Sequence, residues 1–91
     1  MISEFLNPDA WMQQSAGPRY VQLRRRLEVG IRDGILAPNT SLPPERELAQ
    51  MTDLSRVTVR KAIQELAEKG LIEQRQGSGS FIRESEARVE Q

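Results

Sequence analysis

Apolar residues recur at helical spacing in three stretches of the chain, and the first of them lies at 19–33. Four apolar side chains in this stretch are spaced three or four residues apart: Tyr20, Leu23, Leu27 and Ile31. This spacing places all of them on one face of a helix. Gly34 follows directly and can adopt the left-handed conformation that commonly ends a helix. The pattern therefore predicts a helix over 19–33.

Two more helices are predicted over 45–52 and 56–69. In the shorter one, Glu45 and Glu47 lie in the first turn, where the helix dipole favours carboxylates. The longer one follows Ser55, whose hydroxyl can accept a hydrogen bond from a free backbone N–H and so cap the helix. Its buried face is expected to consist of Val59, Ala62, Ile63, Leu66 and Ala67. A short helix, a tight turn and a longer helix are together typical of a helix-turn-helix.

Residues 71–83 predict a β-hairpin, because two short apolar segments flank a glycine-rich loop. The segments are Leu71-Ile72 and Phe81-Ile82, and the loop is Gly77-Ser78-Gly79. Glycine supplies the φ values that a tight reversal needs. In the connector at 35–44, Pro38-Asn39 is a turn signal and Leu42 can anchor the segment in the core. The predicted fold is mainly α, with three helices followed by a small β-hairpin.

The two ends of the chain, 1–17 and 84–91, are predicted to lie outside the folded core. In the first segment, Pro8 can start a short helix through Gln14. Three interpretations of this segment stay open: a flexible tail, a helix on the domain surface, and a dimer contact through Trp11. The last segment is charged and poor in apolar residues, so we expect it to fray.

Charge is unevenly distributed along the chain, although the net charge is zero, with 13 basic and 13 acidic residues. Residues 18–83 hold twelve basic and eight acidic residues, a net charge of +4, whereas each end carries −2. The predicted core is therefore basic and its ends are acidic. Because a net charge of +4 is mild, what matters is whether the basic residues share one face.

Composition excludes several kinds of chemistry. The chain has no cysteine and no histidine, which excludes disulfides, the common zinc sites and catalysis by either side chain. No nucleophile–base pair, cluster of metal ligands or phosphate-binding loop is visible, so we expect no enzyme, no cofactor and no metal site. No apolar run approaches the roughly 20 residues that span a bilayer, and the N-terminus does not resemble a signal peptide. These features fit a cytoplasmic protein without a membrane partner.

The third predicted helix carries the first set of candidate binding residues. The outward side chains of its N-terminal half are basic or hydroxylic, with no acidic residue before Glu65: Ser55, Arg56, Thr58, Arg60 and Lys61. A helix fits the DNA major groove, where arginine can bond to O6 and N7 of guanine. Hydroxyls and backbone N–H groups at a helix start suit phosphate oxygens. The alternative is a solvated cationic face without a partner.

Two further places could complete a DNA-binding surface. Arg46 lies in the first turn of the second helix, the helix that crosses the phosphate backbone in a helix-turn-helix. There it could reach a phosphate or a base while Glu45 and Glu47 stay clear; the alternative is a local ion pair with one of them. The hairpin loop contributes Arg75, Gln76, Gly77, Ser78 and Gly79. Arginine in a minor groove is a recurring contact, and the alternative is an ordinary turn.

Together, residues 18–83 resemble the N-terminal winged helix of the GntR family of bacterial transcription regulators. The matching motifs, in order, are PRYVQLRRRL, GIL before a proline-containing turn, LPPERELA, LSRVTVRKAIQELAEKGLI and RQGSGSFI. The first and last of these resemble the HutC-type branch most. The family often has serine where this chain has Pro44, and glycine where it has Asn39. The resemblance implies a winged helix-turn-helix, three helices plus a two-stranded wing.

The resemblance also implies sequence-specific binding to double-stranded DNA, for repression rather than activation. The residues implied to meet DNA are Arg46 from PERE, then Ser55, Arg56, Thr58 and Arg60, and in the wing Arg75, Gln76, Gly77 and Gly79. It further implies a C-terminal domain that binds a small effector and supplies most of a homodimer interface, so that two copies bind a palindromic operator. We therefore expect an N-terminal extension at 1–17, the DNA-binding domain at 18–83, and at 84–91 the start of a linker to that second domain.

A winged helix can instead serve as a protein-interaction module, with apolar or mixed-charge residues on its third helix. The run from Arg56 to Lys61 contains no acidic residue, which disfavours this alternative. Salt separates the two functions, since binding to DNA falls by orders of magnitude when the salt concentration rises about fourfold.

Overall fold

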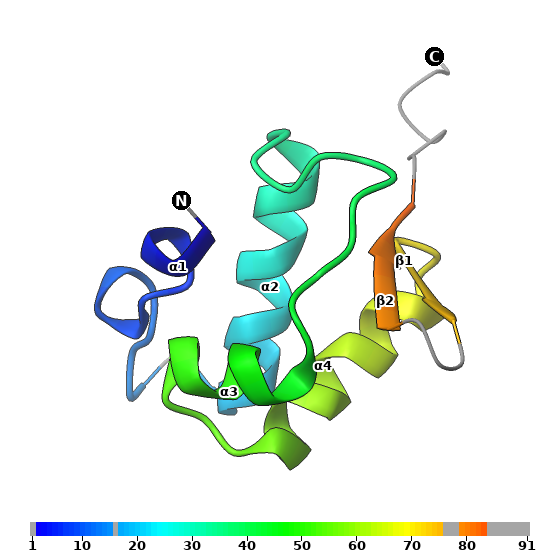
Figure 1. Cartoon of the computed structure of the whole chain (residues 1–91). Helices are drawn as coiled ribbons and strands as arrows, with labels where there is room; N and C mark the ends of the chain where they lie inside the picture. The colour runs from blue at the N-terminus through cyan, green and yellow to red at the C-terminus, as the bar shows by residue number, and fades with distance from the viewer. Residues whose placement is uncertain (1, 16, 76–78, 84–91) are drawn as a thin grey trace.

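The computed structural model describes residues 2–15, 17–75 and 79–83, and its elements follow the predicted order. The helices and strands are α1 (Ile2–Phe5), the 3-10 helix η1 (Pro8–Ala10), α2 (Arg19–Arg32), α3 (Glu45–Thr52), α4 (Arg56–Glu68), β1 (Ile72–Arg75) and β2 (Gly79–Ile82) (Figure 1). The three main helices and the hairpin begin and end within one residue of their predicted bounds. The predicted fold, three helices with a two-stranded antiparallel wing, is confirmed.

The core lies where α2 packs against α4, and α3 and the hairpin close it from the sides (Figure 1). Leu23 and Leu27 of α2 and Leu66 of α4 are fully buried, as their helical spacing predicts. Tyr20 and Ala67, at the edges of the two stripes, are only half-buried. The apolar face of each helix therefore points inward, which turns its polar face to the surface.

A tight turn joins α3 to α4. Asp53 ends α3 in the left-handed conformation, with φ of 59°, and this reverses the chain within three residues. The backbone N–H of Leu54 donates to the carbonyl of Ala49 at 3.1 Å, and the Leu54 side chain is buried. The hydroxyl of Thr52 donates to the carbonyl of Leu48 at 2.7 Å. The turn thus fixes the start of α4 relative to α3.

Strand β2 of the hairpin forms hydrogen bonds with β1 and also with the connector that precedes α3. Ile72 faces Ile82 in the antiparallel ladder, and both are buried. Asn39, in the left-handed conformation at φ of 67°, donates from its backbone N–H to the carbonyl of Ile82 at 2.8 Å. The backbone N–H of Leu42 donates to the carbonyl of Ser80 at 2.8 Å, and the side chain of Leu42 is buried as predicted. The connector before α3 therefore lies along β2 and ties the wing to the helical core, a pairing that the sequence did not predict.

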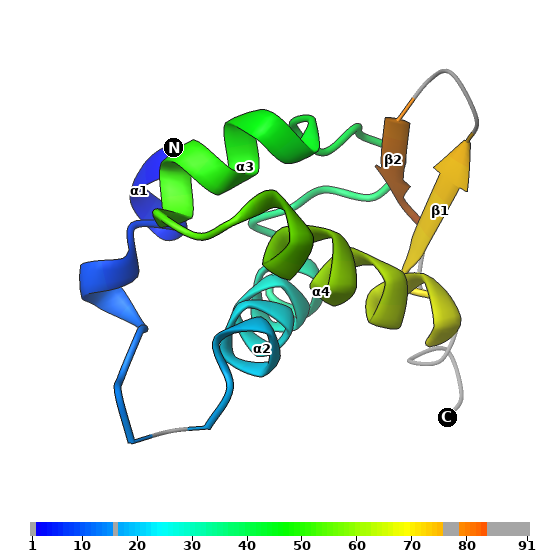
Figure 2. The same ribbon diagram turned by 90° about the horizontal axis from the view of Figure 1, so that it is seen from below.

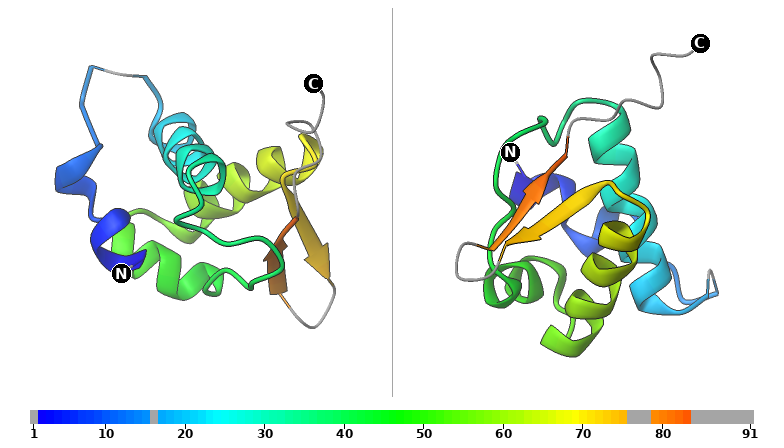
Figure 3. Two further views of the ribbon diagram at one scale, coloured as in Figure 1. Left: turned by 90° about the horizontal axis from the view of Figure 1, so that it is seen from above. Right: turned by 90° about the vertical axis from the view of Figure 1, so that its right-hand side faces the viewer.

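The N-terminal segment packs on α2, on the side of the molecule away from the hairpin (Figures 1 and 3). Leu6 is fully buried in the core, and Phe5 lies so close to Gly30 that a Cβ there would approach its ring at 2.9 Å. The side chain of Gln22 bonds to the backbone N–H and carbonyl of Gln13 at 2.8 and 2.7 Å. The prediction that 1–17 lies outside the folded core is therefore wrong for Leu6, which is part of the core. Of the three interpretations left open, the helix on the domain surface comes closest, although the helical turn that starts at Pro8 spans three residues instead of reaching Gln14.

A dimer contact through Trp11 stays a prediction. The side chain of Trp11 is half-buried against the core. Its Nε1 is buried and has no hydrogen-bond partner among the described residues.

Candidate nucleic-acid interface

The start of α4 carries two neighbouring hydroxyls. The backbone N–H of Thr58 donates to Oγ of Ser55 at 3.1 Å, so Ser55 caps the helix as predicted. The hydroxyls of Ser55 and Thr58 also lie 2.9 Å apart, in hydrogen-bond contact. Only one of the two protons is used in this contact, which leaves the other hydroxyl able to donate to an anion at the N-terminus of the helix.

One groove brings together candidate residues from three separate elements. It lies between the start of α3, the side of α4 that carries Arg56 and the hairpin, and its lining includes Arg46, Arg56, Arg75 and Gly79 together with Glu45. Figure 2 shows these elements in one view, with β2 next to the N-terminal end of α3. Arginines that are far apart in the sequence thus lie on one surface. The net charge of the chain could not show whether the basic residues share a face.

The guanidinium groups of Arg46 and Arg56 are available to a ligand. Both side chains are exposed, and within the described ranges neither forms an ion pair. Arg46 forms no ion pair with Glu45 or Glu47 in the described residues, so the alternative interpretation of Arg46 as a local ion pair is not supported. Uncompensated arginines on one groove attract polyanions, because no internal carboxylate has to be displaced first.

Arg60 is different, since it pairs with Glu45 across the gap between α4 and α3. Its Nη2 lies 3.1 Å from one carboxylate oxygen, and its Nε lies 3.2 and 3.3 Å from the two oxygens. The hydrogen bond to Glu45 and the attraction of its charge raise the pKa of Arg60, so this group stays charged. The expectation that both glutamates stay clear of the cationic face is therefore wrong for Glu45, because the helix-turn-helix places it directly across from Arg60.

The wing presents its arginine at the end of β1. The guanidinium of Arg75 lies over the ring of Phe81 with its carbon 4.5 Å from the ring centre, and its Nη2 is 3.3 Å from a carboxylate oxygen of Glu73. Gly79 begins β2 with φ of 95°, a conformation that favours glycine. The other three loop candidates, Gln76, Gly77 and Ser78, lie outside the described residues.

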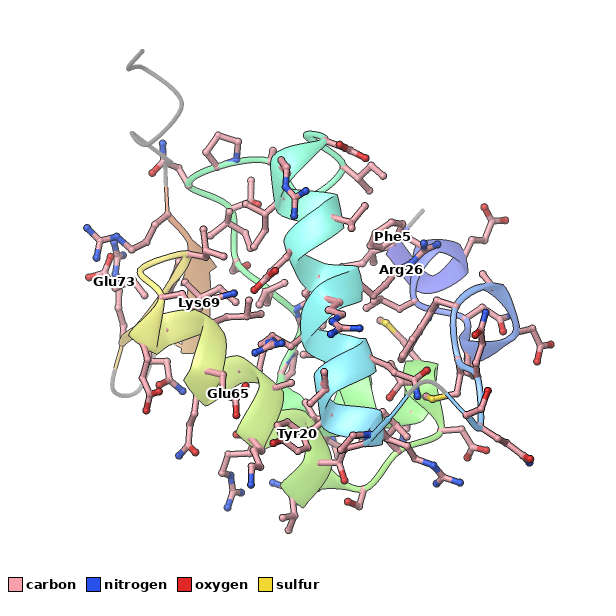
Figure 4. All side chains as sticks on the ribbon, turned by 180° about the vertical axis from the view of Figure 1, so that it is seen from behind. Phe5, Tyr20, Arg26, Glu65, Lys69 and Glu73 are labelled. Carbon is pink, nitrogen blue, oxygen red and sulfur yellow. The ribbon has the colours of Figure 1, made fainter. Side chains whose placement is uncertain are left out.

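The basic run at 24–26 has a mainly structural role. Arg24 bonds to Glu65 at 3.0 Å and so joins α2 to α4, and Arg26 donates from Nε to the carbonyl of Phe5 at 2.9 Å. Figure 4 shows Arg26 beside Phe5, whose ring centre lies 4.0 Å from the guanidinium carbon. Of the three arginines, Arg24 and Arg26 are half-buried and Arg25 is exposed.

Val57 is an exposed apolar residue of α4 that the sequence analysis did not name as a candidate. Val57 follows Arg56 in the first turn of the helix, and 71% of its surface is exposed. Its signal in the sequence was an apolar residue on the polar side of the helix, between Arg56 and Thr58.

Other kinds of site are not seen in the described ranges. No group of three or more His, Cys, Asp or Glu residues in them is arranged to hold a metal ion. None of the helices described has the length and apolar character needed to cross a bilayer.

The sequence model of one family, described as bacterial regulatory proteins of the gntR family, matches residues 19–82. This chain belongs to the GntR family. Among curated relatives, the HTH-type transcriptional regulator YurK of Bacillus subtilis is 41% identical over 69 residues, which is 76% of this chain and 28% of that protein. The HTH-type transcriptional repressor NagR of the same organism is 39% identical over 79 residues, which is 87% of this chain and 32% of that protein. The chain thus spans less than a third of the length of these two curated relatives.

Solved structures agree with this family assignment. The DNA-binding domain of AraR in complex with operator ORX1 is 35% identical, with a TM-score of 0.71, over 78% of this chain and 86% of that one. A GntR family transcriptional regulator from Listeria monocytogenes is 27% identical, with a TM-score of 0.77, over 86% of this chain and 68% of that one. The GntR winged helix is therefore the fold of this chain.

Proposed function

We propose that this chain is the DNA-binding domain of a transcription regulator and binds double-stranded DNA sequence-specifically. The observation that carries the proposal is the groove in which Arg46, Arg56 and Arg75 come together from α3, α4 and the hairpin. Arginine is suited to this task because its planar group bonds to phosphate or guanine through two parallel N–H groups.

Each element has its own part in the proposed complex. Helix α4 enters the major groove, where Arg56 and Arg60 contact bases or phosphates and the hydroxyls of Ser55 and Thr58 hold a phosphate. Arg46, at the start of α3, contacts a phosphate or a guanine. The wing contacts the minor groove, and its proposed contact residues are Arg75, Gln76, Gly77 and Gly79.

The relatives support the proposal and extend it to the whole protein. AraR is named as a DNA-binding domain in complex with an operator, and NagR is named as a repressor. We propose repression as the outcome of binding here too, by a cytoplasmic homodimer on a palindromic operator. A further domain, after a linker that begins at 84–91, would supply the dimer interface and bind a small effector. The assignment to the HutC-type branch is part of this proposal.

The decisive test compares two exposed arginines, of which only Arg46 lines the groove. Arg46→Ala should weaken binding to a selected duplex about tenfold or more and lower the salt dependence by about one counterion. Arg25→Ala removes the same charge from α2 and should change the affinity only slightly. Fluorescence anisotropy at two salt concentrations measures both effects. Equal, small losses for the two variants would contradict the proposed site, and binding that ignores salt would favour the protein-interaction module.

A further inference from the structure

Val57 is the most exposed large apolar side chain in the described part of the chain, at 71%, compared with 53% for Ile35. It lies on the first turn of α4, the turn that also carries Arg56 and Thr58. Because an α-helix turns about 100° per residue, Val57 points roughly opposite to the buried stripe that contains Val59 and Ile63. It therefore stands at the outermost line of the helix.

Neither packing nor helix formation accounts for a valine at this position. Its side chain contributes nothing to the core, and β-branched residues lower helix stability relative to alanine. Its exposed neighbours on α4 are Arg56, Arg60 and Lys61, which are all cationic donors. Val57 is thus a single apolar contact point within a surface that is otherwise complementary to a polyanion.

The edge of each base pair in the major groove offers one matching apolar group, the C5-methyl of thymine. The arginines beside Val57 bond best to O6 and N7 of guanine on the same edge. We propose that Val57 reads a thymine methyl group in the DNA site, next to a guanine contacted by Arg56 or Arg60. This inference rests on the proposed function, and it makes Val57 a specificity-determining residue that contacts no phosphate.

Replacing thymine by deoxyuridine tests the contact, because it removes the methyl group and leaves every hydrogen-bonding group in place. Duplexes selected by this chain from a randomised library are first aligned, and each recurrent thymine is then replaced singly. At one thymine beside a guanine, the replacement should weaken binding of the unaltered chain about fourfold, the effect of leaving one methyl-sized apolar group in water. At the other thymines, the affinity should stay unchanged.

Val57→Ala completes the comparison, since an exposed valine can be shortened without opening the core. The variant should bind the thymine and deoxyuridine duplexes with equal affinity, whereas Gln64→Ala, a change two turns further along the exposed side of α4, should keep the difference. The inference is overturned if no deoxyuridine replacement weakens binding, if no recurrent thymine is selected, or if Val57→Ala still discriminates. A library from which no sequence is enriched would overturn the proposed function itself.

Discussion

Arg60 carries its own counter-charge in the structure, and this sets it apart from Arg46 and Arg56. The pair with Glu45 is partly open to solvent, with the side chains of Arg60 and Glu45 50% and 29% exposed. Exposed pairs of this kind contribute little to stability, so a phosphate can take the place of the carboxylate at small loss. We therefore expect Glu45 to affect binding more than folding, because it draws Arg60 toward α3 and would lower the local attraction for DNA.

Glu45→Gln should raise the affinity for random-sequence duplex DNA about threefold at low salt and leave thermal stability nearly unchanged. The reason is that the change removes a negative charge from the groove and releases Arg60 to neutralise a phosphate, which should also steepen the salt dependence by up to about one counterion. Anisotropy titrations at several salt concentrations measure the affinity and the slope together.

Glu47→Gln is the matched control. Glu47 lies in the same turn of α3 and carries the same charge, but it forms no ion pair with an arginine described in the structure. Both variants lose a carboxylate from the first turn of α3, so a difference between them comes from the position of Glu45 in the groove beside Arg60. If both raise the affinity equally, with the same salt slope, the pair with Arg60 plays no part in binding.

At the scale of elements, the sequence predicted α2, α3 and α4 because each carries its own signals. A stripe at helical spacing, Ser55 as a cap and glycine after the last turn are all local, and local signals can be read one segment at a time. The pairing of the connector with β2 is not local, since Asn39 and Ile82 are distant in the chain and neither residue type specifies the other. The same limit concealed the pairing of Glu45 with Arg60, which depends on the angle between two helices.

Ser55 allows the stability of α4 to be separated from its binding role. Ser55→Ala removes the acceptor for the backbone N–H of Thr58 and should lower the free energy of unfolding by about 1 kcal/mol. Ser55→Asp keeps a good capping oxygen and should leave stability nearly unchanged, but it places a carboxylate where a phosphate is proposed. Urea unfolding and duplex titration should therefore rank the two variants in opposite order. A Ser55→Asp protein that binds DNA as tightly as the unaltered chain would remove the start of α4 from the interface.

At the scale of the whole molecule, the segment before α2 belongs to the folded unit and the basic groove lies on the other side. Phe5 and Leu6 are held by Arg26 and by the core, whereas the groove is formed by α3, α4 and the hairpin. The sequence did not reveal this role, because the apolar residues before Pro8 are too few to show a period. We therefore expect substitutions in this segment to change stability without changing binding at the proposed groove.

Leu6→Ala should expose that separation. Truncating a fully buried leucine costs about 2–5 kcal/mol, which is a large part of the marginal stability of a domain of this size. The urea midpoint should fall sharply, while the folded protein in the absence of urea keeps its affinity for a selected duplex. Leu6→Met preserves the volume and should cost less than about 1.5 kcal/mol. An unfolding midpoint that Leu6→Ala leaves unchanged would mean that the segment rests on α2 without stabilising it, and a loss of affinity in the still-folded variant would mean that it also shapes the groove.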